Sequence, residues 1–381
     1  MDRNPISRRN FTQSIAATLA AVVAAPRTFA ARPDALSDAL APEDVIKLSA
    51  NENPYGPSQK AIEAITRSES VAMRYPEVLR PRTMEAIAKL HGVKRENVLL
   101  GCGSTEILHI ADLAFVGTQK KLVVAEPTFE SIAYYADQCR AQTLKVPLTA
   151  DHRLDLPKMA EACDATVGLV YVCNPNNPTG GIVKRAELRA FLHRVPVSTV
   201  VLVDEAYYHF VEDPDYASAF EWFGKYPNLV LARTFSKVYG MAGMRLGYSV
   251  ASKELTEAMS PHILYFSANA AVLAAAIASL EDPQHVPQMR KRLNDTRRAV
   301  VAELERQGRS VIPSETNFIM VDLGGDVAPV IAQFRARKID VGRKFPSMPN
   351  WLRVSIGTPE QMAAFEKALN EIVPMGAARA A

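Results

Sequence analysis

Short apolar runs alternate with longer stretches of helical periodicity through the middle of the chain. The runs occupy residues 97–100, 121–125, 143–146, 167–172, 199–203, 229–232 and 248–250. Between them, apolar positions recur three and four residues apart, in segments that include residues 106–115, 129–139, 156–163 and 184–192. Runs that are short and continuously apolar are typical of strands buried on both faces. The alternation predicts an α/β fold with a large domain, whose mainly parallel seven-stranded sheet is covered by helices.

The pattern changes after the last of these runs. A long helical stretch over residues 285–307 precedes two strand patterns, 317–322 and 352–356, and two helical patterns, 327–338 and 359–372. This mixture predicts a small C-terminal α+β domain. The expected organisation is a targeting segment over residues 1–30, an N-terminal arm that starts the small domain over 31–75, the large domain over 76–284, and the small domain over 285–381.

The first 30 residues have the pattern of an export signal. Arg8 and Arg9 precede a run of small apolar residues at 15–25, and Thr28-Phe29-Ala30 offers a small-x-small cleavage site. The run is too short to span a bilayer as a stable helix. The paired arginines predict a twin-arginine signal and a periplasmic protein that folds before export. An amphipathic helix with two chance arginines is the alternative.

Composition and charge exclude several function classes. The net charge is +3, and residues 1–30 alone hold four arginines against one aspartate, so the remainder is close to neutral. No basic patch favours nucleic acid or an anionic membrane as a partner. With 48% hydrophobic residues and no apolar run of membrane length after Ala25, the chain has enough apolar material for a large core. The four cysteines lack metal-like or paired spacing and are interpreted as free, mostly buried thiols.

The stretch over residues 234–247 carries the clearest candidate chemistry. Lys237 follows a predicted strand, stands between the hydroxyls of Thr234 and Ser236, and is followed by Arg245. Hydroxyls and a guanidinium favour a bound phosphate. A lysine amine beside a phosphate site is the arrangement expected of a Schiff base with a phosphorylated aldehyde cofactor. The alternative is a surface lysine in a glycine-rich loop.

Two further strand ends carry polar groups. A loop rich in asparagine and proline follows the strand at 167–172, and Asp204 and Tyr207 follow the strand at 199–203. A carboxylate at the end of an apolar strand is costly without a cation, so Asp204 should have a partner. Either a nearby arginine supplies the charge, or a protonated heterocycle does so and Tyr207 reaches the same ring.

Two anion sites are predicted elsewhere. The turn at residues 101–106 combines glycines and hydroxyls before a helix, the arrangement with which a helix N-terminus binds phosphate, although a capped helix explains it equally well. It lacks the spacings of dinucleotide and nucleotide-triphosphate motifs. Arg353 lies in an apolar strand with no neighbouring acid, so its partner is either a substrate carboxylate or a distant acidic residue.

Taken together, these motifs resemble the fold-type I, class I/II aminotransferases that depend on pyridoxal phosphate. The resemblance rests on Asn177-Pro178-Thr179-Gly180, Asp204-Glu205-Ala206-Tyr207, Ser236-Lys237 with Arg245, and Arg353. It is closest to the histidinol-phosphate aminotransferase branch, which shares Asn51-Glu52-Asn53-Pro54, Arg74-Tyr75-Pro76 and the segment 174–180. The resemblance extends from about Val45 to the C-terminal region and implies the fold of that family.

The resemblance also implies roles for individual residues. Lys237 carries the cofactor and moves a proton at the substrate α-carbon, Asp204 keeps the pyridine nitrogen protonated, and Tyr207 completes the catalytic group. The implied ring contacts are Asn177, Phe129, Ala206 and Tyr207. The implied phosphate contacts are Gly103, Ser104, Thr105, Thr234, Ser236 and Arg245, with Tyr75 from the second subunit of a homodimer that shares its active sites.

On the substrate side, the resemblance implies that Arg353 binds a carboxylate and that Arg343, Asn51 and Tyr55 lie nearby. The segment 340–346 lacks the usual arginine-proline order, and export argues against histidine biosynthesis. We therefore expect transfer of an amino group between an amino acid, or an amine resembling histidinol phosphate, and a 2-oxo acid. A decarboxylase related to the amino-acid phosphate decarboxylases would carry the same ring motifs. A regulator on this scaffold would need a DNA-binding domain, for which the chain has neither the length nor the basic patch.

Overall fold

The computed structural model describes residues 44–374, and residues 45–374 belong to one compact unit. The predicted export signal at residues 1–30 and the beginning of the predicted arm lie outside the described residues. Among residues 44–374, no helix combines the length and apolar character that crossing a membrane requires. All four cysteines are free, but only Cys163 and Cys173 are buried.

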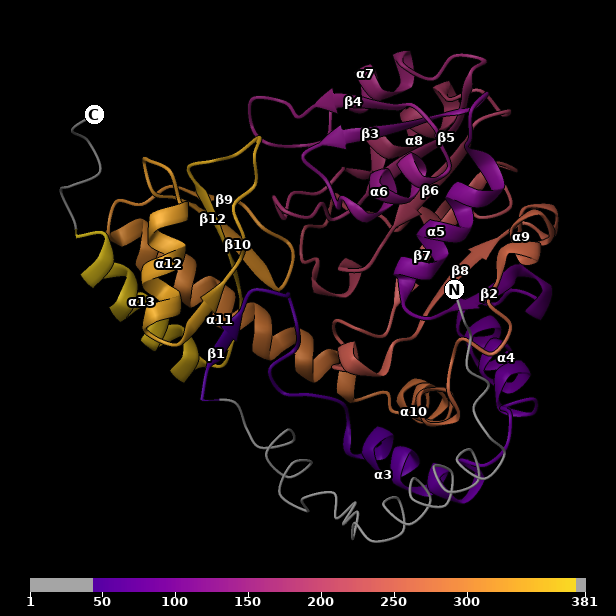
Figure 1. The fold of residues 1–381 in the computed structure, drawn as a ribbon, viewed down its shortest axis with the longest axis horizontal. Coiled ribbons are helices and arrows are strands. Elements are labelled where there is room, and N and C mark those ends of the chain that lie inside the picture. Colours follow the sequence, from indigo (N-terminus) through magenta and orange to yellow (C-terminus); the bar gives the residue numbers. More distant parts are fainter. Residues whose placement is uncertain (1–43, 375–381) are drawn as a thin grey trace, which may run out of the picture. The chain divides into compact units, whose positions relative to one another are not determined.

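A seven-stranded sheet forms the centre of the unit, as predicted (Figure 1). Its spatial order is β2-β8-β7-β6-β5-β3-β4. The strands are β2 (Val98–Gly101), β3 (Lys121–Glu126), β4 (Thr143–Pro147), β5 (Val167–Cys173), β6 (Val200–Asp204), β7 (Leu229–Thr234) and β8 (Gly247–Ala251). Strand β8 runs antiparallel to both of its neighbours, and the other pairings are parallel. The prediction of a mainly parallel sheet is confirmed.

Helices cover both faces of the sheet because successive residues of each buried strand point to opposite sides. Leu122, Leu169 and Val230 pack with α5 (Ser104–Phe115), α6 (Ser131–Gln138) and α9 (Lys253–Met259). Their neighbours Val123, Val170 and Leu231 pack on the opposite face with α7 (Leu156–Glu161) and α8 (Arg185–Arg194). This two-sided burial explains why the strands appear in the sequence as continuous apolar runs.

Three further helices pack beside the sheet. These are α3 (Gln59–Arg67), α4 (Leu79–His91) and α10 (Ala270–Leu280), and α10 contacts the other two. Helix α4 begins at Leu79. Pro81 therefore lies in the first turn, where its missing N–H is not needed for the helix.

The C-terminal part is built around a small antiparallel sheet. Strands β12 (Trp351–Ser355), β10 (Phe318–Asp322) and β9 (Val311–Ile312) lie in that order. The associated helices are α11 (His285–Arg306), α12 (Ala328–Ala336) and α13 (Pro359–Ile372). Strand β1 (Ile46–Leu48), from the described part of the predicted arm, pairs with β11 (Ile339–Val341). Strands β1, β9 and β11 were not predicted, because two or three residues are too few for a periodic pattern.

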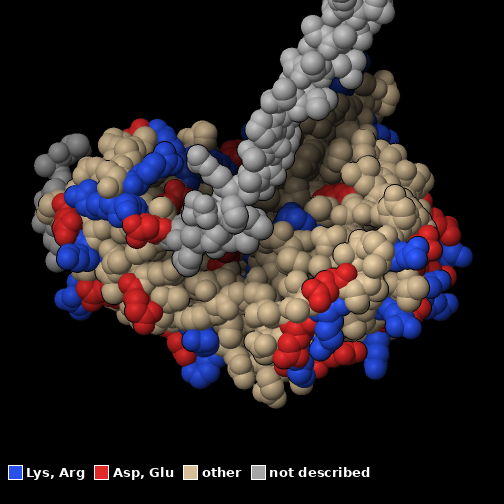
Figure 2. Space-filling model, turned by 60° about the horizontal axis from the view of Figure 1, so that its bottom comes forward, with Lys and Arg blue, Asp and Glu red and all other residues tan. Residues whose placement is uncertain are grey.

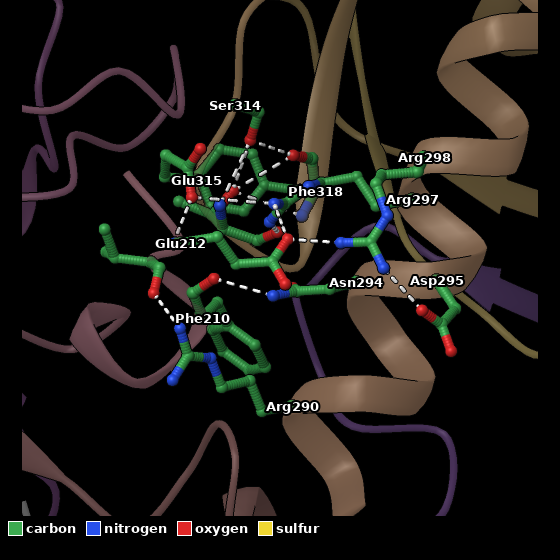
Figure 3. A network of polar contacts seen from close by, with 12 residues as sticks. Phe210, Glu212, Arg290, Asn294, Asp295, Arg297, Arg298, Ser314, Glu315 and Phe318 are labelled. Carbon is green, nitrogen blue, oxygen red and sulfur yellow. Dashed lines mark hydrogen bonds and ion pairs between the residues drawn. The ribbon is translucent and has the colours of Figure 1, made fainter. Parts of the chain in front are cut away.

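A polar network joins α11 to both parts (Figure 3). On one side, Asn294 Nδ2 donates a hydrogen bond to the Phe210 carbonyl at 2.8 Å, and Arg290 donates to the Val211 carbonyl. On the other, the buried Arg297 donates to the Thr316 carbonyl at 2.6 Å. The same guanidinium lies 3.7 Å from Glu212 and 3.6 Å from Glu315. The network therefore fixes the loop after β6 relative to the start of β10, the strand that pairs with β12.

Charged side chains of both signs are interspersed on the face shown in Figure 2. Within the described residues, oppositely charged side chains also pair along single helices, such as Lys291 with Asp295 and Arg306 with Glu303. This face accordingly carries no extended area of one charge, which agrees with the near-neutral balance of the chain.

Candidate active site

A cavity of about 450 Å³ lies beside the carboxyl ends of β5, β6 and β7, where open α/β sheets place their ligands. The structure brings most of the predicted site residues to its wall. They are Asn51, Ser104, Thr105, Phe129, Asn177, Asp204, Ala206, Tyr207, Thr234, Ser236, Lys237, Arg245 and Arg353. The wall also contains residues that were not predicted: Ala50, Glu52, Cys173, Ala242 and Gly243.

Lys237 presents its amine to this cavity rather than to the protein surface. Its Nζ donates a hydrogen bond to the Ala50 carbonyl at 3.1 Å and lies 5.6 Å from the centre of the Tyr207 ring. Burial, assisted by the positive charge of Arg353, lowers the pKa of Lys237 to about 8. An amine with this pKa loses its proton readily enough near neutral pH to act as a nucleophile or a base.

Asp204 is a buried carboxylate without a counter-charge. Its Oδ2 accepts a hydrogen bond from the Tyr171 hydroxyl at 2.9 Å, and its Oδ1 accepts one from the Ala206 N–H at 3.1 Å. Burial raises the pKa of Asp204 to about 6. The nearby Arg233 pairs with Glu205 at 2.7 Å, and no residue in the range 44–374 forms an ion pair with Asp204. No arginine in this part of the chain pairs with Asp204, so the second interpretation, a protonated heterocycle as its partner, remains.

Hydroxyl groups and a guanidinium surround the N-terminus of α5 at one end of the cavity. No side chain accepts a hydrogen bond at the cap position, which Gly103 occupies with a φ of 77°. Arg245 Nη1 donates to Ser236 Oγ at 3.2 Å. A Cβ atom on Gly103 would lie 2.2 Å from Arg245 Nη2, so only glycine permits this approach. The arrangement has the donors and the positive charge that a phosphate group requires.

The guanidinium of Arg353 is held in place without an acidic partner. Its Nη1 donates to Asn177 Oδ1 at 2.7 Å and its Nη2 to the Ser49 carbonyl at 2.6 Å. Nε is buried and has no hydrogen-bond partner within the described residues, none of which forms an ion pair with Arg353. Burial lowers the pKa of Arg353. Of the two expected partners, the distant acid is absent from the described part of the chain, which leaves room for an anionic ligand.

Four predicted site residues do not line the cavity of their own chain. Gly103 flanks it as described above. The Tyr55 ring lies 3.8 Å from the guanidinium carbon of Arg292, while Tyr75 is 75% exposed and stacks on Phe266 at 4.9 Å. Arg343 forms an ion pair with Glu130. Direct contact of Tyr55 and Arg343 with a ligand in this cavity is therefore not supported, because each has another partner.

Tyr171 is a site residue that the sequence analysis missed. It lies on β5, where Cys173 is in register with Asp204 of β6, and its hydroxyl reaches the Asp204 carboxylate across the two strands. A single tyrosine in an otherwise aliphatic buried strand was a usable signal, because a buried hydroxyl needs a hydrogen-bond partner.

The residues of the cavity fit pyridoxal phosphate. The buried, unpaired carboxylate of Asp204 suits the protonated ring nitrogen, and the α5 N-terminus with Arg245 suits the phosphate. Lys237 supplies an amine in the same cavity for the aldehyde. These groups come from separate segments of the chain, and each of them suits a different part of the same cofactor. Their presence in one cavity therefore supports pyridoxal phosphate more strongly than any single motif does.

Comparisons with known proteins identify the family of the chain. The family profile described as aminotransferase class I and II matches residues 43–369. A histidinol-phosphate aminotransferase from Symbiobacterium thermophilum is 39% identical over 335 residues, which cover 87% of this chain and 92% of that protein. The structure of histidinol-phosphate aminotransferase from Sinorhizobium meliloti in complex with pyridoxal-5'-phosphate has a TM-score of 0.82 and 25% identity, and the match covers 92% of this chain and 99% of that chain.

A third similarity concerns the fold alone. L-threonine-O-3-phosphate decarboxylase from Porphyromonas gingivalis has a TM-score of 0.74 and 22% identity, covering 86% of this chain and 99% of that chain. The fold by itself therefore does not separate amino transfer from decarboxylation. The family profile and the sequence similarity favour amino transfer, and the chain belongs to the class I and II aminotransferases, a family of pyridoxal-phosphate enzymes.

Proposed function

We propose that this aminotransferase moves an amino group between an amino acid, or an amine resembling histidinol phosphate, and a 2-oxo acid whose carboxylate binds Arg353. The observation that carries the proposal is that Lys237, Asp204 and Arg353 line one cavity. Pyridoxal phosphate is the cofactor, and it supplies a ring that withdraws electrons from the substrate α-carbon.

Lys237 is placed to move the proton at that carbon. Because its pKa is lowered to about 8, the amine accepts a proton and returns it without a large energetic penalty at neutral pH. The hydrogen bond to the Ala50 carbonyl orients Nζ when the amine is free.

Asp204 and Tyr207 act from the base of the cavity. The two hydrogen bonds from Tyr171 and Ala206 hold the Asp204 carboxylate in one orientation, so that its charge faces the cavity. The Tyr207 hydroxyl accepts a hydrogen bond from Asn51 Nδ2 at 3.2 Å, which leaves its own proton available to a ligand. Burial raises the pKa of Tyr207, so this hydroxyl stays protonated and remains a donor.

Replacement of Arg353, which should bind the substrate carboxylate, tests the proposal. Replacing Arg353 with glutamine removes a charge-assisted interaction worth about 1.5–3 kcal/mol, and we expect KM for amino and 2-oxo acids to rise about 10–100-fold. The measurement is steady-state kinetics with a panel of amino donors and 2-oxo acids, with product amino acids and carbon dioxide both quantified. The control is Arg337→Gln, since Arg337 pairs with Glu371 away from the cavity.

Two outcomes of this panel would contradict the proposal. Unchanged kinetics in Arg353→Gln would mean that the carboxylate binds elsewhere. Release of carbon dioxide without a new amino acid would assign the chain to the decarboxylases instead.

We also propose that the active form is a homodimer with shared sites. Several large apolar side chains are exposed on one chain: Met73, Tyr75, Val78, Leu264 and Tyr265. The Leu264 N–H donates to Glu106 Oε1 at 3.2 Å, and Glu106 also accepts from the Cys102 N–H, so this surface adjoins the N-terminus of α5. A second copy that covers the exposed side chains would bring Tyr75 of the partner subunit towards the phosphate end of the cavity. A single-chain mass for the active enzyme in solution would contradict this arrangement.

A final proposal concerns location, and it rests on the sequence of residues 1–30. We propose twin-arginine export to the periplasm of the folded protein. Replacing Arg8 and Arg9 with lysine should leave the protein in the cytoplasmic fraction, as measured by immunoblotting of separated fractions. The matched control replaces Arg3 and Arg27 with lysine, which keeps the same charge and spares the pair. Export that persists without the pair would contradict the proposal.

A further inference from the structure

A second cavity of about 420 Å³ shares Arg353 with the first. Its wall carries four cationic side chains, Arg335, Arg343, Lys344 and Arg353, and one acidic one, Asp340. Such a concentration of positive charge beside the carboxylate site suggests, at first sight, room for a second anionic group of the substrate.

The ion pairs within the chain change this picture. Arg335 lies 3.9 Å from Asp340, and Lys344 lies 2.5 Å from Asp326. Arg343 pairs with Glu130. Among the cations of this cavity, Arg353 is therefore the only one without an acidic partner in the described residues. The cavity has one uncompensated positive charge rather than four.

Glu130 occupies a position that links the two cavities. It follows Phe129, which lines the first cavity, and precedes α6 (Ser131–Gln138) of the large sheet region. Its partner Arg343 lies after β11 in the C-terminal part, 213 residues further along the chain. The pair therefore connects the two parts of the fold beside the substrate position.

Arg343 and Arg353 are close enough for one substrate to meet both. The guanidinium carbons of Arg343 and Arg353 lie 4.3 Å and 5.3 Å from the centre of the same Phe345 ring. A dicarboxylate held by Arg353 could extend its second carboxylate to Arg343 only by displacing Glu130. The released Glu130 would then stand unpaired beside a negative charge, which disfavours binding.

We propose that Glu130 is a specificity-determining residue, which occupies Arg343 and thereby selects substrates with one carboxylate and an uncharged side chain. This inference rests on the proposed amino transfer. It disfavours dicarboxylic substrates. Of the two donors proposed above, it favours the amino acid over the phosphorylated amine, because a phosphate carries about −1.5 to −2 charge against a single free cation. The pair is about half exposed, with side-chain exposures of 52% and 56%, so it contributes little to the stability of the fold.

The test compares a monocarboxylic and a dicarboxylic acceptor, pyruvate and 2-oxoglutarate, using the holoenzyme. The native protein should prefer pyruvate. In Glu130→Gln, the ratio of kcat/KM for 2-oxoglutarate over pyruvate should rise at least tenfold, because Arg343 becomes available. The matched control is Glu187→Gln, which also removes a half-exposed carboxylate paired with an arginine, at 3.1 Å from Arg153, and should leave the ratio unchanged.

A double variant and a binding measurement show whether the free Arg343 causes the change in acceptor preference. The double variant Glu130→Gln/Arg343→Gln should not show the increased preference for 2-oxoglutarate, because the guanidinium that binds the second carboxylate is then absent. Isothermal titration calorimetry with succinate and butyrate, which are not turned over, should show tighter succinate binding in Glu130→Gln than in the native protein. An unchanged ratio and unchanged succinate affinity, or a gain that survives in the double variant, would overturn the inference. Loss of amino transfer with every acceptor would instead contradict the proposed function, and succinate binding would still decide the role of Glu130.

Discussion

We expect the Lys237→Ala variant to lose amino transfer by a factor of roughly 10²–10⁴ or more, the range associated with a positioned proton-transfer group. It also loses covalent attachment of pyridoxal phosphate, because no other lysine lines the cavity in the described part of the chain. The loss of attachment is measured by mass spectrometry after borohydride reduction, which should add the cofactor mass to the native protein and not to the variant. The control is Lys253→Ala, since Lys253 is exposed and pairs with Glu257 on α9. Turnover retained in Lys237→Ala would refute the assignment.

The same variant tests whether two subunits share each site. Mixed dimers of Lys237→Ala and Tyr75→Ala chains contain one site with an intact Lys237 and an intact Tyr75 of the partner subunit. Random exchange should then restore roughly a quarter of native activity, since half of the dimers are mixed and each has one complete site. If the mixed dimers were no more active than the two parent variants, the shared site would be contradicted.

The Asp204→Asn variant is expected to show two opposite effects. Its activity and its affinity for pyridoxal phosphate should fall by about 10²–10⁴-fold, since loss of one member of a buried charge pair costs about 3–5 kcal/mol. Cofactor affinity is measured by fluorescence titration of the apoprotein, and activity by the transfer assay. In the amide, Oδ1 can still accept from the Ala206 N–H, while Nδ2 donates to the Tyr171 hydroxyl and so reverses the bond that Tyr171 donates to the native carboxylate. The variant therefore removes the charge and keeps both side-chain contacts.

The apoprotein of the same variant should be more stable than the native apoprotein. Burial raises the pKa of Asp204 from 3.8 to about 6, so the folded state binds this proton more tightly than the unfolded chain does. The buried charge of Asp204 therefore destabilises the native apoprotein. This destabilisation is absent below about pH 4, grows as pH rises, and is complete above about pH 6. At pH 8 the variant should therefore gain on the order of 2–3 kcal/mol in free energy of unfolding, and about half of that at pH 5.

Denaturant unfolding of the two apoproteins at pH 5 and pH 8 measures this difference. When the cofactor is bound, Asp204 gains its counter-charge, and the order of stability should reverse. A native apoprotein that is more stable than Asp204→Asn at pH 8 would mean that another group compensates the carboxylate.

The sequence predicted the central sheet well because buried parallel strands carry an unusual pattern. A strand such as β5 is apolar at every position, since both faces contact helices, and it ends abruptly in a polar loop. Strands of two or three residues, such as β9 and β11, have no pattern of their own. They form because neighbouring segments supply their hydrogen-bond partners, which the linear sequence does not reveal.

The positions of Lys237, Asp204 and Arg245 could be predicted for a similar reason. The carboxyl ends of parallel strands meet at one edge of a sheet, so polar groups that follow separate strands are brought to the same cavity. The contact between Tyr171 and Asp204 was missed because it depends on the register of two adjacent strands. The contacts of Tyr55 with Arg292 and of Tyr75 with Phe266 could not be predicted either. In each pair the two residues are distant in sequence.

The amino-acid sequence alone determined the α/β class, the strands that form the sheet and the chemical groups available at their ends, because burial and turn formation leave local patterns in a chain. Only the tertiary structure decided which of the charged groups remain uncompensated. Glu130 and Arg343 are 213 residues apart, and Asp204 lies close to Arg233 without pairing with it. Charge compensation depends on distances of a few ångströms between such residues, and these distances are set by packing rather than by sequence separation.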